Sequence, residues 1–309
     1  MNSSLYDSVH SPNNQPLATR REFFQSLKLL SLGVVLPGCA IRSSGDGVSK
    51  EKKELGAQLW SVRDLIGTNL SGTLEALSRM GFSGIEPYDY DGSFYGIPAK
   101  EFNRMCDELD LEIYATHTGI TIDNAREYAE TAAAIGMRFL VLPSFKGRPA
   151  DTIDDFKATA EEMNRIGEVC NEFGVRFAYH NHEFELRKIE DVLPYDVLLS
   201  ETEAGLVSFQ ADTYFFAREK LDPIPFFDKY AGRFSMLHLK DVDFTGNSCI
   251  IGNGIIDFKT VLSSARKAGV ELLIYEQEEC SEGTSLHCAE QSLRYIHSHL
   301  LKNQNHGRK

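Results

Sequence analysis

The stretch DDFKATAEEMNRIGEVCNEFGVRFAYHNHEFE, residues 154–185, contains the repeating unit of the fold. Apolar residues recur with helical spacing from Asp154 to Phe173, Gly174 follows, and a short apolar run occupies residues 176–180. A glycine just past a helical pattern is typical of a left-handed residue that ends the helix. The stretch therefore predicts a helix, a tight turn and a strand that ends in a polar cluster.

The same alternation extends along the chain in both directions. Strands are expected at Gly56–Trp60, Gly84–Glu86, Glu112–Thr116, Phe139–Leu142, Arg176–His180, Val207–Ala211, Ser235–Leu239 and Leu272–Tyr275. Helices are expected at Ser71–Met80, Lys100–Leu109, Asn124–Ile135, Asp154–Phe173, Val192–Leu199, Pro225–Tyr230, Phe258–Ala268 and Ser285–Leu301. Gly81, Gly136 and Gly269 also stand just past helical patterns. Eight strand–helix units in about 250 residues are the count of a (β/α)8 TIM barrel.

A doubly wound open sheet is the alternative with the same alternation. It usually carries a glycine-rich turn after its first strand, but Ser61-Val62-Arg63-Asp64 follows here. Gly252-Asn253-Gly254 lacks the lysine and the preceding strand of a Walker loop. The sequence thus predicts a single-domain α/β TIM barrel over residues 55–301, followed by a polar tail, residues 302–309.

The composition is that of a globular protein. The 309 residues are 42% hydrophobic and 25% charged, and no apolar run reaches the roughly 18 residues of a membrane-spanning helix. The formal net charge is −13, from 45 acidic and 32 basic residues. Such a charge opposes binding to phosphate backbones, so no nucleic-acid partner is expected. The oligomeric state stays open.

Residues 1–38 have the pattern of a bacterial export signal. Thr19-Arg20-Arg21-Glu22-Phe23-Phe24 precedes a weakly apolar stretch, and Leu36-Pro37-Gly38-Cys39 ends it. This order predicts a twin-arginine signal joined to a lipobox, although Pro37 departs from the lipobox pattern. Cys39 would be lipidated and residues 39–54 would form a flexible tether, giving a periplasmic or outer-membrane lipoprotein that meets the membrane only through its lipid. A frayed amphipathic N-terminus is the alternative.

Five cysteines follow Cys39, and they form no recognisable pattern. They are Cys106, Cys170, Cys249, Cys280 and Cys288. Their number is odd and no CxxC spacing occurs. We therefore expect neither a disulfide framework nor a zinc finger.

Polar residues gather where the predicted strands end, which is where a TIM barrel carries its reactive groups. They are Gln58, Glu86, His117, His180, His182, Glu185, Gln210, Asp212, His238, Lys240, Glu276 and Glu278. Side chains two apart on a strand point the same way. A ring of His180, Asp212, His238 and Glu276 from strands five to eight suits one divalent ion such as Mn²⁺, Zn²⁺ or Mg²⁺. Whether His180, His182 or Glu185 completes the set stays open.

Four motifs resemble those of the xylose isomerase-like barrels. They are Gly56-Ala57-Gln58-Leu59-Trp60-Ser61-Val62-Arg63-Asp64, Tyr179-His180-Asn181-His182, His238-Leu239-Lys240-Asp241 and Ile274-Tyr275-Glu276-Gln277. The family includes sugar phosphate isomerases and epimerases, inosose dehydratases and AP endonucleases. The resemblance implies metal ligands at Asp212, His238 and Glu276, with His180 standing where ketose epimerases have a glutamate.

That substitution bears on the reaction that the resemblance implies. Ketose epimerases use the strand-five and strand-eight carboxylates as ligands and as two bases on opposite faces of the substrate, and His180 leaves this pair incomplete. The histidine-rich strand end is closer to inosose dehydratase-like members, which eliminate water. The DNA-repair branch requires a basic groove, against which the net charge of −13 argues.

The expected chemistry is removal of an α-proton from a keto-sugar to give an enediolate that the metal stabilises. Glu276 would be ligand and base, His182 or Glu86 a second acid or base, and Lys240 a donor to the oxyanion. The residues expected to bind substrate are Gln58, Trp60, His117 and Glu185. No compact phosphate cup is evident, so a keto-sugar, polyol or oxidised glycoside is the expected small-molecule substrate.

Three functions fit this pattern. The first is a metal-dependent sugar isomerase or epimerase, and the second is a hydratase or lyase acting on 3-keto-glycosides or inososes. The third is a sugar-binding lipoprotein without activity. A binding protein gains nothing obvious from three metal ligands, so an enzyme is favoured.

Overall fold

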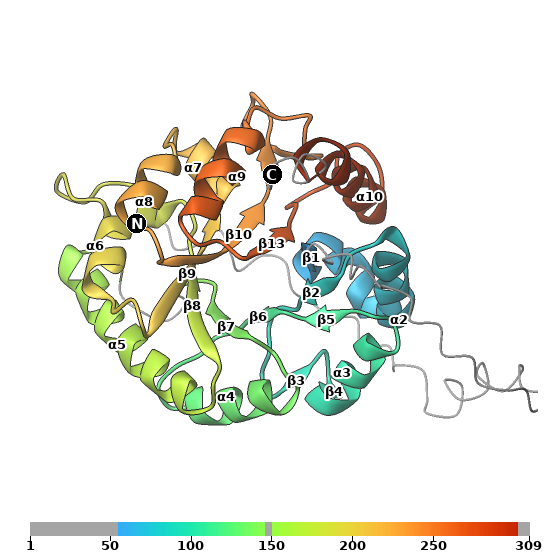
Figure 1. Cartoon of the computed structure of the whole chain (residues 1–309), viewed down its shortest axis with the longest axis horizontal. Coiled ribbons are helices and arrows are strands. Elements are labelled where there is room, and N and C mark those ends of the chain that lie inside the picture. The colour runs from blue at the N-terminus through green and yellow to red at the C-terminus, as the bar shows by residue number, and fades with distance from the viewer. Residues whose placement is uncertain (1–54, 146–149, 302–309) are drawn as a thin grey trace, which may run out of the picture. The chain divides into compact units, whose positions relative to one another are not determined.

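The computed structural model describes residues 55–145 and 150–301. The predicted export signal, lipidation site at Cys39, tether and C-terminal tail lie outside the described residues. Figure 1 shows the described part as a ring of strands surrounded by helices.

Nine parallel strands form the central sheet, in the order β5-β2-β1-β13-β10-β9-β8-β7-β6. They are β1 (Leu55–Gln58), β2 (Gly84–Glu86), β5 (Glu112–Ile113), β6 (Ala115–His117), β7 (Phe139–Leu142), β8 (Arg176–His180), β9 (Val207–Asp212), β10 (Phe234–Leu239) and β13 (Leu272–Tyr275). β5 and β6 are two parts of one predicted strand, divided at Tyr114. Because β5 pairs with β2 and β6 with β7, the sheet is a nearly closed barrel, and the predicted TIM barrel is confirmed.

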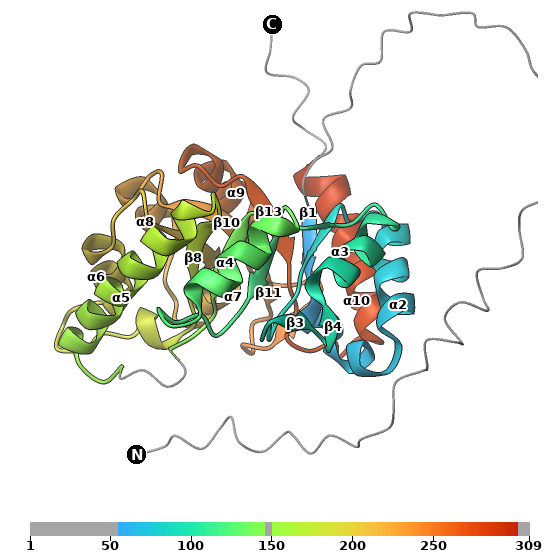
Figure 2. The same ribbon diagram turned by 90° about the horizontal axis from the view of Figure 1, so that it is seen from below.

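Helices follow the strands and cover the barrel. They are α2 (Arg63–Met80), α3 (Ala99–Asp107), α4 (Ala125–Ala134), α5 (Ile153–Glu172), α6 (Pro194–Glu201), α7 (Thr213–Arg218), α8 (Ile224–Lys229), α9 (Phe258–Lys267) and α10 (Ser285–Tyr295). Short elements are η1 (Leu59–Val62), η2 (Phe184–Leu186), η3 (Ile296–Leu300) and the hairpins β3 (Ser93–Phe94) with β4 (Ile97–Pro98) and β11 (Asp241–Val242) with β12 (Ser248–Cys249). Of the helices in the described residues, the last, α10, lies beside the first, α2 (Figures 1 and 2).

Two helices differ from the sequence prediction for local reasons. α2 begins at Arg63 rather than Ser71. Asn69 interrupts it with non-helical angles (φ −153°, ψ 62°), and the Oδ1 atom of Asn69 accepts a hydrogen bond from the Gly72 amide. The apolar pattern is therefore regular only beyond Asn69. The short helix α7 was not predicted, and its start is fixed by the side chain of Asp212. The predicted left-handed glycines are confirmed, with φ of 72° at Gly174 and 107° at Gly81.

The interior of the barrel is filled by apolar side chains that lead up to the polar strand ends. This cluster comprises Tyr114, Ala115, Phe139, Val141, Ala178, Met236, Leu272 and Ile274. Side chains two apart on a strand point the same way, so the rows Ala178/His180, Met236/His238 and Ile274/Glu276 each run from the apolar interior to a polar group. The barrel interior below these polar groups is therefore apolar.

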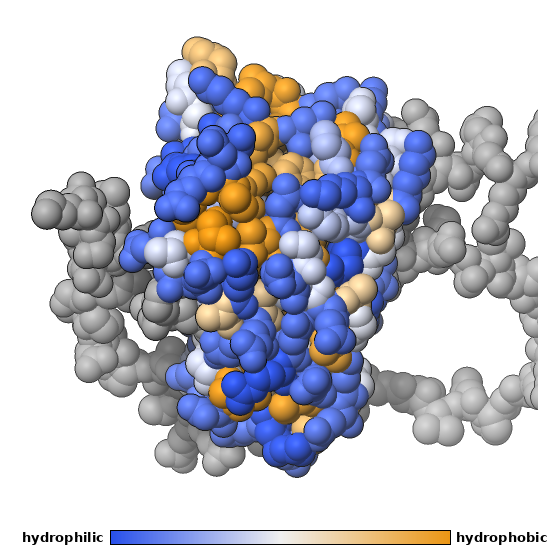
Figure 3. Space-filling view, turned by 90° about the vertical axis from the view of Figure 1, so that its left-hand side faces the viewer, coloured by the Kyte–Doolittle hydropathy of each residue, from blue (hydrophilic) through white to orange (hydrophobic). Residues whose placement is uncertain are grey.

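Figure 3 shows one outer face of the described part of the chain. On the face that carries α5, α6 and α8, hydrophilic residues predominate, with apolar patches between them (Figure 3). Within residues 55–145 and 150–301, no helix combines the length and the apolar character needed to cross a bilayer.

Candidate metal centre

Four ligand-type side chains converge at the ends of consecutive strands of the sheet. His180 ends β8, Asp212 ends β9, His238 lies near the end of β10, and Glu276 follows β13. All four residues are at most 5% exposed, and each offers a ligand atom within 4.8 Å of the others. His238 Nδ1 lies 2.6 Å from Glu276 Oε2. Asp212 Oδ2 lies 3.9 Å from both His238 Nδ1 and His180 Nε2.

The two carboxylate oxygens of Asp212 are in different situations. Oδ1 accepts bonds from the amides of Tyr214 and Phe215 and so starts α7. Oδ2 is buried and makes no hydrogen bond to any residue that the structure describes. Burial raises the pKa of Asp212, and the ammonium of Lys240 opposes part of this rise. A buried carboxylate oxygen without a donor is costly, and a cation at this point would satisfy it.

His180 and His182 are neutral imidazoles. Burial, reinforced by neighbouring positive groups, lowers the pKa of His180 well below its usual value and that of His182 to about 3. The Nδ1 atoms of both rings are buried and lack a partner within the described part of the chain. Neutral imidazole is the form that binds metals, and a set of two imidazoles and two carboxylates suits a divalent ion. The residues present therefore fit the metal that the sequence predicts.

Of the three candidates for the fourth ligand, His180 is the one that lies in the group. Glu185 is fully buried elsewhere, where its carboxylate accepts hydrogen bonds from the Tyr179 hydroxyl and, at 3.1 Å, from the His182 amide. Burial raises the pKa of Glu185 to about 8. Glu185 thus stabilises the turn after β8. These contacts do not support the expectation that it binds the metal or the substrate.

Glu86 lies on the far side of His238 from the other carboxylates. Its carboxylate accepts bonds from His238 Nε2 at 2.7 Å, Gln58 Nε2 at 2.8 Å and Gln210 Nε2 at 2.7 Å. Burial would raise the pKa of Glu86, but His117 and His238 together lower it. A metal-binding histidine commonly donates its other N–H to such a carboxylate, which fixes the tautomer.

The sequence predicts an acid or base at Glu86, but its contacts are those of a residue that orients a metal ligand. The carboxylate is fully buried and both of its oxygens are occupied, so it orients His238 instead. Burial alone would lower the pKa of His238, but Glu86 and Glu276 outweigh it and raise the pKa to about 10, so without a metal the ring is protonated between the two carboxylates. A metal ion at Nδ1 would replace the proton of that nitrogen, while Nε2–H keeps its bond to Glu86.

Gln58 and His117, which the sequence predicts to bind substrate, belong to the hydrogen-bond network around Glu86. Gln58 Oε1 accepts a bond from the Trp60 amide, so both ends of this side chain are engaged. His117 Nε2 is 2.8 Å from Gln210 Oε1. Trp60 itself is half-buried, with its indole N–H donating to Glu278 Oε2 at 3.0 Å. Among these expected substrate residues, Trp60 is the one nearest to solvent.

Lys240 is a fully buried cation between three carboxylates. Its Nζ lies 3.5 Å from Asp212 Oδ2 and 3.5 Å from Glu276 Oε2, and it donates a hydrogen bond to Glu278. Burial acts to lower the pKa of Lys240, but the three carboxylates raise it above its usual value. Burial likewise opposes ionisation of Glu276, yet Lys240 and His238 hold its pKa well below the usual range. Both groups are thus charged.

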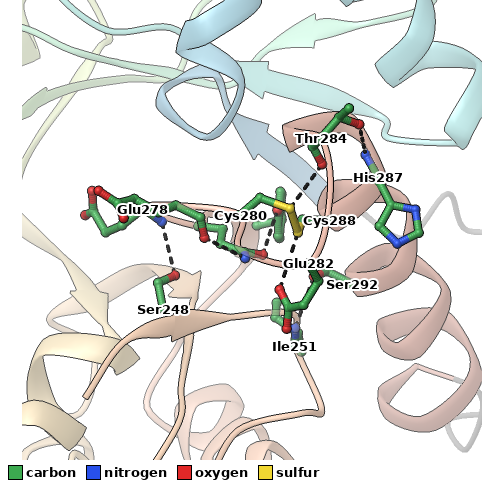
Figure 4. Close-up of a disulfide and its surroundings, with 12 residues drawn as sticks. Ser248, Ile251, Glu278, Cys280, Glu282, Thr284, His287, Cys288 and Ser292 are labelled. Carbon is green, nitrogen blue, oxygen red and sulfur yellow. Dashed lines mark hydrogen bonds between the residues drawn. A yellow bond between two sulfur atoms is a disulfide. The ribbon is translucent and has the colours of Figure 1, made fainter. Parts of the chain in front are cut away.

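Sequence reasoning assigned no role to Asn181 and Glu278, and it missed a disulfide. Asn181 Oδ1 accepts a bond from the Asp212 amide and so aligns the ends of β8 and β9. Cys280 and Cys288 form a disulfide between the segment after β13 and α10, with Cα atoms 6.0 Å apart (Figure 4). The expectation of no disulfide was wrong, because the fold brings these two cysteines together and their spacing alone carries no signal.

The matching family model spans most of the barrel. The model described as xylose isomerase-like TIM barrel matches residues 74–299. An inosose dehydratase of Clostridium tetani is 24% identical over 295 residues, which cover 80% of this chain and 97% of that relative. The prediction of an enzyme is confirmed at the level of the family.

Solved structures show the same fold. A sugar phosphate isomerase/epimerase from Parabacteroides distasonis superposes with a TM-score of 0.72 and 23% identity, covering 84% of this chain and 99% of that one. The 3-keto-D-glucoside 4-epimerase of E. coli gives 0.61 and 14%, with 79% and 98% covered. The IOLI protein, solved with a bound zinc atom, gives 0.63 and 14%, with 79% and 96% covered. The chain therefore belongs to the xylose isomerase-like TIM barrel family.

Proposed function

We propose that the protein is a divalent-metal-dependent sugar isomerase or epimerase that removes the α-proton of a keto-sugar. The observation that carries this proposal is the buried Oδ2 of Asp212, which makes no hydrogen bond to a described residue and faces ligand atoms of His180 and His238. A divalent ion held by His180, Asp212, His238 and Glu276 would polarise the substrate's carbonyl and neighbouring hydroxyl and make the α-hydrogen acidic.

The charges of the site assign the remaining roles. Glu276 is ionised and accepts the α-proton, while the Lys240 ammonium donates to the oxygen that gains negative charge. His182, with a pKa of about 3, is neutral and a weak base, so it offers the substrate a hydrogen bond rather than taking up its proton. Return of the proton from Glu276 to the neighbouring carbon gives isomerisation, and delivery of a proton from water to the opposite face, with Glu276 later losing its proton to water, gives epimerisation.

The surroundings favour an uncharged part of a carbohydrate next to the reacting carbons. Glu86, Asp212, Glu276 and Glu278 gather around this point, and the ammonium of Lys240 is already shared by three of them. A phosphate placed beside these carboxylates would be repelled. A keto-sugar or an oxidised glycoside is therefore the preferred substrate class.

Dehydration is the second candidate. Glu276 Oε2 and Lys240 Nζ lie only 3.5 Å apart, so a base and an acid stand on the same side of the site. Glu276 would take the α-proton while Lys240 protonates the departing β-hydroxyl, which leaves as water and creates a carbon–carbon double bond. The related inosose dehydratase of Clostridium tetani supports this alternative.

The proposal is tested by metal analysis of the full-length protein beside the Asp212→Ala/His238→Ala double variant. Near-stoichiometric Zn²⁺ or Mn²⁺ in the wild type but not in the variant supports the site. If the wild type binds neither ion after reconstitution, the proposal is refuted. Incubation with keto-sugars and oxidised glycosides in D₂O then reports the reaction. Deuterium in a saturated product supports isomerisation or epimerisation, and an unsaturated product supports dehydration.

The proposed location is the outside of the cytoplasm, with attachment through a lipid on Cys39. The Cys280–Cys288 disulfide supports this location, since disulfides persist in oxidising compartments. Cell fractionation of the Cys39→Ala variant tests the anchor. The variant should move to the soluble fraction, and its retention in the membrane would refute lipidation at Cys39.

A further inference from the structure

Glu278 lies beside the ligand group without belonging to it. Its side chain is 31% exposed, whereas that of Lys240 is fully buried. Oε1 accepts a hydrogen bond from the Lys240 ammonium, and Oε2 accepts one from the indole N–H of Trp60 at 3.0 Å. The carboxylate thus connects the end of β10 to the segment after β1, on the solvent side of Lys240.

The position of Lys240 creates a conflict with metal binding. Its ammonium lies 3.5 Å from Asp212 Oδ2 and from Glu276 Oε2, two of the oxygens that face the ligand group. A lysine ammonium and a divalent ion are attracted to the same oxygens and repel each other. A third carboxylate that binds the ammonium from the solvent side leaves those oxygens to the metal.

Glu278 is held in place to do this. Its amide donates to Ser248 Oγ at 3.1 Å, and the amide of Gln277 donates to Ser61 Oγ at 3.0 Å. Two residues further, the Cys280–Cys288 disulfide ties the segment to α10, as Figure 4 shows. The segment after β13 is therefore anchored to three other parts of the barrel.

We propose that Glu278 is a positioning residue that holds the Lys240 ammonium away from the metal-ligating oxygens of Asp212 and Glu276. The inference rests on the proposed function, because it assumes that a metal binds there. Without the negative charge of Glu278, the ammonium has Asp212 and Glu276 as its remaining partners and competes with the metal for them.

The test measures the affinity of full-length variants for Zn²⁺ by competition with a chelator. Glu278→Gln keeps an oxygen for the Trp60 indole but loses the charge, and it should bind Zn²⁺ about 10-fold more weakly than the wild type. Lys240→Met should bind at least as tightly as the wild type, because it removes the competing charge. The double variant Glu278→Gln/Lys240→Met should recover at least wild-type affinity.

The recovery in the double variant separates positioning from a structural role. If Glu278→Gln binds Zn²⁺ as the wild type does, the inference is refuted. If the double variant stays as weak as Glu278→Gln, Glu278 acts through its own charge rather than through Lys240, which also refutes it. Failure of the wild type to bind metal is a distinct result that removes the proposed function itself.

A matched control and an optical reporter complete the experiment. Glu279→Gln makes the same charge change at the next, exposed residue and should leave Zn²⁺ affinity unchanged. Trp60 is the single tryptophan of the chain, so its fluorescence reports this site alone. An emission spectrum close to that of the wild type in Glu278→Gln shows that the variant is folded around Trp60.

Discussion

Glu86 and Asp212 are both fully buried carboxylates at strand ends, but their surroundings differ. Both oxygens of Glu86 accept hydrogen bonds, from Gln58, Gln210 and His238. Asp212 uses Oδ1 to start α7, while Oδ2 has no hydrogen-bond donor among the residues that the structure describes. The hydrogen-bonding capacity of both Glu86 oxygens is thus used within the protein. Oδ2 of Asp212 makes no hydrogen bond to a described residue and faces the ligand atoms of His180 and His238.

The difference shows how a structural carboxylate can be told from one that awaits a ligand. Burial alone does not separate them, because both residues are 0% exposed. The cost of a buried charge is offset at Glu86 by hydrogen-bond donors that the protein supplies, whereas Oδ2 of Asp212 has the Lys240 ammonium at 3.5 Å but no hydrogen bond within the described part of the chain. A metal ion bound at Oδ2 would complete the compensation of this charge. Replacing carboxylates by amides of the same shape therefore tests the comparison directly.

The largest effect is expected for Asp212→Asn. The amide oxygen can still accept from Tyr214 and Phe215 and start α7, but the negative charge at the ligand group is lost. Zn²⁺ affinity should fall about 100-fold or more, with little change in melting temperature. Chelator competition and thermal melting check this. Undiminished affinity would mean that the open oxygen is not a ligand.

Glu86→Gln is expected to weaken Zn²⁺ binding by about 10-fold, through loss of the group that orients His238. The new amide N–H₂ would also face a donor, either Gln210 at the position of Oε1 or Gln58 and His238 at that of Oε2, which costs about 1–3 kcal/mol of stability. Chelator competition and urea unfolding measure the two effects. A variant with normal metal affinity but no turnover would instead restore Glu86 as an acid or base.

Glu185 adds a third case, a buried carboxyl whose pKa is raised to about 8 by burial. In the unfolded chain, the Glu185 carboxyl has the ordinary pKa of about 4.3. Between that pH and pH 8, the folded state therefore binds more protons than the unfolded state. The wild type thus loses stability as the pH rises through this window. Between pH 5 and pH 8, the free energy of unfolding of Glu185→Gln should rise relative to that of the wild type by about 1 kcal/mol per pH unit. Urea unfolding at pH 5 and pH 8 measures the gain, and a constant difference would contradict it.

The smallest effect is expected for Glu172→Gln at the surface. Glu172 on α5 pairs with Arg126 on α4 at 2.5 Å, and their side chains are 54% and 63% exposed. Exposed pairs contribute about 0–1 kcal/mol, and this one is remote from the ligand group. Melting temperature should change little and Zn²⁺ affinity not at all. A loss of Zn²⁺ affinity here would show that overall charge, rather than the local carboxylates, governs binding.

The barrel and the set of polar residues at its strand ends can be predicted from the sequence alone. Short apolar runs such as residues 176–180 and glycines such as Gly174 are local signals, because each depends on a few neighbouring residues. Since parallel strands place their carboxyl ends at one face, Asp212, His238 and Glu276 had to gather once the fold was known.

The tertiary structure decided how each member of that set is used. Whether a carboxylate is open or saturated depends on donors far away in sequence, as Glu86 and His238 illustrate across 152 positions. The same holds for Lys240, whose ammonium joins Asp212, Glu276 and Glu278, and for the disulfide at Cys280. Sequence reports which groups a strand end carries, but hydrogen bonding and charge pairing are three-dimensional, so only the folded chain shows which of them are left open for a ligand.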